Sequence, residues 1–518
     1  MENISKEYTR ARRDFDIYTD TSADYSLPDY NGDIKRVLYT SAEVSPTSKF
    51  NEDEDVCASG IVTYDIIYLN SENEIDHISF TSDYDVSAKL RSENTASADI
   101  ETRVSAFSHR LFGPRRINMT ASLTSEVRVI ETAKLETEVA ESLGEDIECI
   151  MQTLEVKSAA FAHSREREYA DAITSPEGVS SDEVEIVHTA ASCIFDEVKA
   201  ELGGVKLSGD FIVSELIKCG DTAPILYKKK IPFEEFIECE DVKPEMSAVA
   251  YANISSISSS VTPLEGGVSI TASIIADYGV RAYGNCEISV MRDAYLKTMG
   301  SEGTYENLGY NTHLGTERRL FSATHTLPLN EICDGGIENV IYTSATGKLG
   351  SIEIEDGAVK INAEVKLQGF CSRTDEHGEE SYHGVKCSFQ TTEKVKLDCH
   401  IPDDAIIECK IRALDSTATI DESNMYIEVL YAVDMAVEAS GSTVRLSALT
   451  AKSDEIFEKR ESEIIVYYPK EDDTLFSIAK AYHTSTRRIA ADNMLTESVM
   501  KDSSKREGLA GIKKLLIK

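Results

Sequence analysis

The chain has 518 residues, of which 41% are hydrophobic, so it is long enough for roughly three or four domains that each bury a core. It carries 91 acidic and 53 basic residues, a formal net charge of −38. Nucleic acid and anionic lipid surfaces are disfavoured as partners because both would repel such a chain. The simpler interpretation, that the acidity only keeps a β-rich protein soluble, stays open.

The N-terminal segment, residues 1–22, has basic residues but no apolar stretch behind them, so it lacks the pattern of a secretory signal. No run of the chain approaches the roughly 18 apolar residues that a membrane helix needs. The 11 cysteines include no CxxC pair, which favours thiols in a reducing compartment over a metal site. We therefore expect a cytoplasmic protein without membrane insertion.

A segment near the start of the chain is repeated much later. Leu27-Pro28 precedes VLYTSA at residues 37–42, and Leu327-Pro328 precedes VIYTSA at residues 340–345. A third, more diverged copy fits between them, at residues 184–298. Repeats as long as residues 184–298 are whole domains, because solenoid repeats run only ~20–50 residues. The expected units are 23–145, 176–300 and 320–450.

Each unit contains the same succession of expected strands. A long strand with alternating apolar residues comes first, at 58–69, 205–213 and 359–370. A second strand follows after a polar loop, at 78–80, 231–233 and 385–389. A further pair closes each unit, at 98–108 with 115–123, 248–258 with 267–276, and 405–416 with 425–436. Alternation of period two indicates half-buried antiparallel strands, so we predict a mainly β protein of three repeated units, each sandwich or barrel-like with about six strands.

Three stretches differ from this pattern. Residues 131–154 are rich in Ala, Glu and Leu, which favours some helix, and residues 292–319 contain several Gly and Asn, which favours a loop. His377 and His383 flank a hairpin tip that we interpret as a solvated turn in preference to a metal site. The chain has no phosphate-binding glycine loop, HExxH or GxSxG, so no catalytic residue, cofactor site or metal ligand is assigned.

The last segment, residues 462–518, has the pattern of a small βααβ module. Residues 464–468 and 515–517 are its expected strands, and Asp473 or Thr474 can cap the first helix. The apolar residues of that helix share one face: Leu475, Ile478, Ala479 and Tyr482. A second helix is capped by either Thr484 or Ser485, contributes Ile489 to the core, and ends near Asp492 and Asn493.

This module resembles LysM, which is best known for binding N-acetylglucosamine polymers in a groove between two loops. The resemblance implies partner- or glycan-binding residues in both loops: Asp472, Asp473, Thr474 and Phe476 in the first, and Asn493, Met494 and Leu495 in the second. Phe476 is either a core residue or an exposed contact. Asp472 stands where the family has glycine, and Gly511 is displaced, which weakens the case for glycan binding specifically.

Three β units followed by a LysM module resemble the SPOCS-domain spore coat morphogenetic proteins of the SipL (SpoIVA-interacting) type. RLFGPRR at residues 110–116 is similar to a recurring segment of that domain. The resemblance implies a non-catalytic adaptor in the mother cell, at the forespore surface. Its LysM would dock to a SpoIVA-like coat ATPase, and the β units would recruit other coat proteins. The alternative is a peptidoglycan- or chitin-binding protein, and a hydrolase with a LysM anchor is least favoured.

Overall fold

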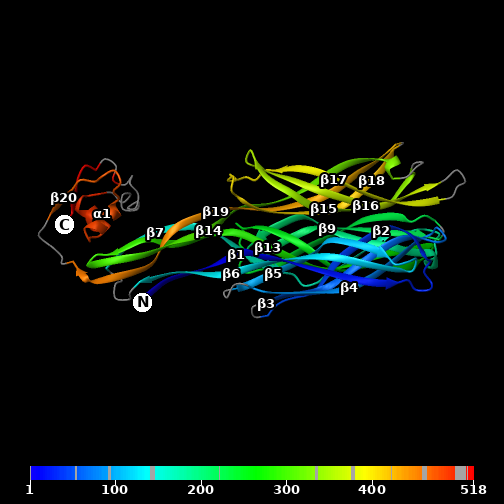
Figure 1. The fold of residues 1–518 in the computed structure, drawn as a ribbon, viewed down its shortest axis with the longest axis horizontal. Helices are drawn as coiled ribbons and strands as arrows, with labels where there is room; N and C mark the ends of the chain where they lie inside the picture. Colours follow the sequence, from blue (N-terminus) through cyan, green and yellow to red (C-terminus); the bar gives the residue numbers. More distant parts are fainter. Residues whose placement is uncertain are drawn as a thin grey trace.

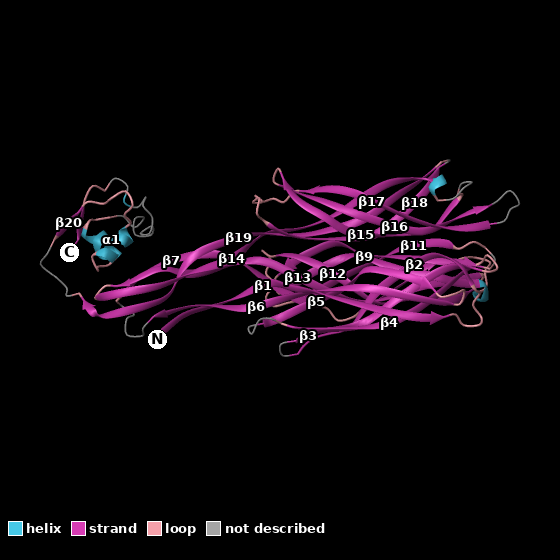
Figure 2. Cartoon of the chain, in the orientation of Figure 1, coloured by secondary structure: helices cyan, strands magenta, loops and turns pink. Residues whose placement is uncertain are grey.

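The computed structural model describes residues 2–52, 55–90, 95–139, 146–220, 222–332, 337–374, 380–421, 423–457, 464–495, 509 and 512–517. These residues are mostly β-strand, with two short α-helices near the C-terminus (Figures 1 and 2). The predicted mainly β fold class is confirmed. No helix in the described part of the chain is long and apolar enough to cross a membrane.

The strands fall into three sets in chain order. The first set is β1 (Glu2–Ser26), β2 (Ile34–Glu52), β3 (Asp55–Asn70), β4 (Ile75–Lys89), β5 (Thr95–Leu111) and β6 (Arg116–Val139). The second is β7 (Ile147–His163), β8 (Arg167–Thr174), β9 (Val184–Glu201), β10 (Gly204–Cys219), β11 (Ile225–Glu238), β12 (Ser247–Leu264) and β13 (Gly267–Leu296). The third is β14 (Met299–Pro328), β15 (Asn339–Glu355), β16 (Ala358–Thr374), β17 (Glu380–Val395), β18 (Ile406–Asp421) and β19 (Asn424–Ile456).

Each set pairs its strands in the same way. The middle strands form an antiparallel meander, which is β2-β3-β4, then β9-β10-β11, then β15-β16-β17. The last strand of each set pairs with the preceding strand and with the opening strand of the set, so that β6 lies between β5 and β1. Likewise β13 pairs with β12, β7 and β8, and β19 pairs with β18 and β14. The three sets therefore repeat one strand topology, to which the middle set adds β8. A short parallel pairing of β6 with β19 joins the first and third sets in one six-stranded sheet.

The two sheets of a set enclose a core because apolar residues alternate along their strands. In β3, Val62 and Ile66 are fully buried and belong to the same apolar cluster as Met119 and Leu123 of β6. The second and third sets have corresponding clusters between their sheets. Each such side chain stabilises the fold by roughly 1.5–3 kcal/mol on burial. The cores thus account for the sandwich-like packing expected from the sequence.

The repeated VLYTSA segment lies where the three sets meet. Tyr39 of β2, His188 of β9 and Tyr342 of β15 occupy matching positions in their sets and form a triangle of rings. The ring centroids are 5.5 Å apart for Tyr39 and His188, 5.0 Å for Tyr39 and Tyr342, and 5.2 Å for His188 and Tyr342. The diverged middle copy therefore contributes a histidine where the other two contribute tyrosine.

Buried charges also join the three sets. Arg281 of β13 lies 2.6 Å from Asp99 and 3.0 Å from Glu101, both on β5, and Lys410 of β18 lies 2.6 Å from Glu101. Burial alone would raise the pKa of the Asp99 carboxyl, but Arg281 and His163 outweigh it and hold that pKa well below its usual range. Asp99 is therefore ionised, and the network ties one strand of each set to the others.

Two local predictions were wrong. Residues 131–139 and 147–154 are strand, in β6 and β7, and 292–319 is strand apart from a two-residue bend between β13 and β14. In both stretches the backbone amides and carbonyls pair with neighbouring strands. This pairing outweighs the local preference for helix or loop. The limits 1–22, 23–145, 176–300, 320–450 and 462–518 remain predictions of domain extent. The strand pairing itself places Glu2–Ser26 in one sheet with Arg116–Val139.

The ends of β7, β13, β14 and β19 extend away from the sandwiches and form what we term the arm (Figure 1). The C-terminal module lies at the end of this arm. It consists of β20 (Ile465–Tyr467), α1 (Leu475–Ala481), α2 (Thr486–Asp492) and β21 (Leu515–Ile517). The strands β20 and β21 pair antiparallel, as the βααβ pattern predicts.

Candidate binding site in the C-terminal module

The helices of the module form as the sequence predicts. Thr474 caps α1, since its hydroxyl accepts a hydrogen bond from the Ser477 amide at 3.0 Å and the Ser477 hydroxyl accepts one from the Thr474 amide at 2.9 Å. Ser485 caps α2 in the same manner through the Arg488 amide at 3.1 Å. Of the predicted apolar residues, Leu475, Ile478, Ala479 and Ile489 are buried, whereas Tyr482 is half-buried and packs against their cluster.

The first loop is held by Asp473. Its carboxylate accepts hydrogen bonds from the Tyr467 hydroxyl and from the Lys470 amide, both at 2.7 Å. This hydrogen bond to Asp473 is the main cause that raises the pKa of Tyr467 to about 12. Asp472 is exposed next to it. Asp473 and Thr474 thus shape the loop, and Asp472 presents its side chain to solvent.

Phe476 lies in the core. Its side chain is 3% exposed, and its ring packs edge-on against Tyr295 of β13 with centroids 5.1 Å apart. Of the two alternatives left open by the sequence, core residue or exposed contact, the structure shows the first. Any part that Phe476 plays in binding is therefore indirect, through the position of α1.

The second loop is held by Asn493. Its side-chain amide donates to the carbonyl of Leu516 at 2.7 Å, and its side-chain oxygen accepts from the Leu516 amide at 2.7 Å. Met494 follows with φ of 53° and a side chain that is 92% exposed, while Leu495 is half-buried. Among the described residues of this loop, Met494 is therefore the most exposed apolar side chain.

The two loops are tied to the same pair of strands. Asp473 bonds to Tyr467 of β20, Asn493 bonds to Leu516 of β21, and Leu516 pairs with Val466 of β20. The structure thus brings the two predicted groups of loop residues onto one small sheet. Backbone groups of both loops and the exposed Asp472 and Met494 could hold a ligand there. That these residues bind one remains a prediction.

Residues outside the module also contact it, and the sequence does not point to them. Glu148 and Asp293 of the arm contact the two helices, and Tyr295 bonds to the connection between the helices. Nothing in the local sequence marks these residues, because each stands in an ordinary strand pattern far from the module in the chain.

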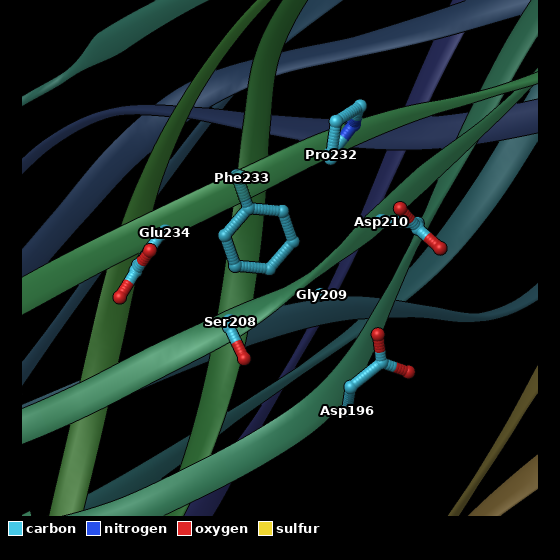
Figure 3. A pocket seen from close by; sticks show the side chains of 7 residues that line it. All are labelled: Asp196, Ser208, Gly209, Asp210, Pro232, Phe233 and Glu234. Carbon is cyan, nitrogen blue, oxygen red and sulfur yellow. The ribbon is translucent and has the colours of Figure 1, made fainter.

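A hollow on the sheet of β9, β10 and β11 is lined by Asp196, Ser208, Gly209, Asp210, Pro232, Phe233 and Glu234 (Figure 3), of which Phe233 belongs to the core. Lys206 pairs with Glu234 at 2.9 Å, and Asp210 lies 3.5 Å from Lys230. These cations offset two of the three carboxylates, Asp210 and Glu234. No group of three or more His, Cys, Asp or Glu is placed to hold a metal ion among the described residues, which do not include His377.

Comparison with known proteins identifies the module. The family model of the LysM domain matches residues 470–499, a range that includes both candidate loops. The chain thus carries a LysM domain near its C-terminus. Neither the curated proteins nor the solved structures that were compared with the chain gave a match.

Proposed function

We propose that the protein is a non-catalytic scaffold in which three β units carry a ligand-binding LysM module. The observation that carries this proposal is the LysM match over residues 470–499, which falls on a module whose two loops share one sheet and expose Met494 and Asp472. A binding module at the end of a long arm is suited to reach a partner while the β units engage others.

We further propose that the partner is a SpoIVA-like coat ATPase and that the protein acts in spore coat assembly, in the mother cell at the forespore surface. The support is the resemblance in module order to SPOCS-domain spore coat proteins. The threefold repetition of one strand topology is in keeping with it. The β units would then recruit other coat proteins, for which their long exposed sheets provide surface.

The second candidate is binding of N-acetylglucosamine polymers, such as peptidoglycan or chitin, in the same loops. The LysM match favours it, because such polymers are the module's usual ligand. Asp472 weighs against glycan binding. Its exposed carboxylate stands where the family has glycine and would obstruct a sugar chain that approaches the loop backbone.

A pair of matched variants tests whether the loops bind. Met494→Glu places a charge on the most exposed apolar residue of the second loop, and Leu202→Glu does the same at a turn that is 80% exposed and lies between β9 and β10. Loss of an interface anchor typically weakens binding by about tenfold or more. We expect this loss for Met494→Glu, measured by pull-down on the ATPase or on peptidoglycan, and no change for Leu202→Glu. Equal binding by both variants would place the site elsewhere.

A further inference from the structure

The LysM module contacts the end of the arm through specific polar groups. The Tyr295 hydroxyl of β13 donates a buried hydrogen bond to the carbonyl of Thr484 at 2.6 Å. The Lys480 ammonium of α1 lies 2.7 Å from both carboxylate oxygens of Asp293. Glu148 of β7 accepts a hydrogen bond from the Thr486 amide at 3.0 Å. Each of these contacts joins the module to a strand of the arm.

Apolar contacts reinforce the same junction. Tyr295 is 1% exposed and, with Ile150 of β7, belongs to the apolar cluster of the module itself. Phe457 follows β19 and is fixed to the arm because its amide donates to the carbonyl of Thr298 at 2.7 Å. Its ring stacks on His483 of the module, with centroids 3.6 Å apart and planes 19° apart. The module core therefore continues into the arm.

The polar contacts fall at one end of the module. Lys480, Thr484 and Thr486 belong to the C-terminal end of α1, the connection between the helices, and the start of α2. The candidate loops join the opposite ends of these helices, at Thr474 and Asn493. Each helix has seven residues and is therefore ~10 Å long. The polar contacts of the arm thus fall at the end of the module away from its candidate ligand loops, while the ring of Tyr295 also reaches Phe476 at the start of α1.

We propose that the end of the module formed by Lys480, His483, Thr484 and Thr486 is a docking surface whose partner is the chain's own arm, at Glu148, Asp293, Tyr295 and Phe457. Small interfaces between domains normally permit relative motion. Here a buried hydrogen bond, an ion pair and a shared apolar cluster hold the module in a fixed position on the arm. The candidate loops then keep a fixed orientation relative to the arm, so a ligand bound there is held at a set position with respect to the β units.

Charge reversal in the full chain tests this docking surface. Asp293→Lys and Lys480→Asp each place like charges opposite one another, and the double variant restores an attractive pair with reversed signs. We measure amide hydrogen exchange over residues 479–486 and 293–298. Each single variant should exchange several-fold faster in both segments, and the double variant should return close to the wild-type rate. The same fast exchange in the double variant as in the singles would refute the ion pair's role.

Two further variants separate docking from folding of the arm. Tyr295→Ala removes the buried bond and the ring contact, and should speed exchange over 479–486 by about tenfold or more. Tyr305→Phe is the matched control, because it removes only the 2.6 Å bond from Tyr305 to Asp293 within the arm. Unchanged exchange over 479–486 in Tyr295→Ala and in both charge-reversed single variants would show that the module is tethered and not docked. Amide exchange is measured without a ligand, so failure of this proposal can be distinguished from failure of the proposed function.

Discussion

Replacing Arg281 by methionine should remove about 3 kcal/mol from the stability of the folded protein. The side chain of Arg281 is 3% exposed and that of Asp99 is 1% exposed, so both charges are in a region without solvent screening. Removing one partner of a buried pair typically costs about 3–5 kcal/mol, because the remaining charge is left uncompensated. The lower end applies here, since Asp99 keeps the Tyr251 hydroxyl at 2.8 Å and Glu101 keeps Lys410 at 2.6 Å.

The assay is equilibrium urea unfolding followed by far-ultraviolet circular dichroism. Lys360→Met is the matched control, because Lys360 pairs at 3.2 Å with Glu353, whose side chain is 56% exposed, and such surface pairs contribute only about 0–1 kcal/mol. The double variant Asp99→Leu with Arg281→Met should recover most of the loss, since no isolated charge remains at Asp99. If Arg281→Met lost no more than Lys360→Met, the network would not be what holds the three sets of strands together.

Three further outcomes are expected. Burial, followed by the charge of Lys157, lowers the pKa of His313 to about 4, below its unfolded value near 6.5. The neutral form of His313 therefore stabilises the fold above pH 6.5. This stability, up to about 3 kcal/mol, is lost as the pH falls toward 4. His313→Asn should flatten that part of a stability–pH profile, and an unchanged profile would contradict the assignment. Asn493→Ala should cost the module about 1–2 kcal/mol and speed amide exchange in β21, because it removes both bonds to Leu516; equal exchange would show that β21 needs no such support. Gly369→Ala should cost about 1–3 kcal/mol in urea unfolding, since a Cβ there would lie 2.1 Å from the Tyr342 carbonyl oxygen, and wild-type stability would mean that β15 yields without cost.

The sequence predicts the regular part of the fold well. Period-two alternation locates the meander strands, and its physical basis is visible in β3, where buried and half-buried residues alternate from Asp55 onward. The matching VLYTSA and VIYTSA segments identify two repeats, and the capping residues Thr474 and Ser485 locate both helices of the module. These features depend on neighbouring residues, so they can be recognised in a single sequence.

The remaining features depend on distant residues. Residues 299–315 contain several glycines and asparagines, yet they are strand because β19 pairs with them along their length. His188 matches Tyr39 and Tyr342 in space but not in residue type, so the sequence does not show it as the third member of the triangle. Tyr295 contacts the module across nearly two hundred residues of chain, which no local pattern can indicate.

The most direct test of the proposed function is a side-by-side binding titration of the full chain against the purified coat ATPase and against purified peptidoglycan. We predict saturable binding to the ATPase that Met494→Glu weakens, with little binding to peptidoglycan. Binding to peptidoglycan alone would contradict the adaptor proposal and assign the LysM domain to the glycan.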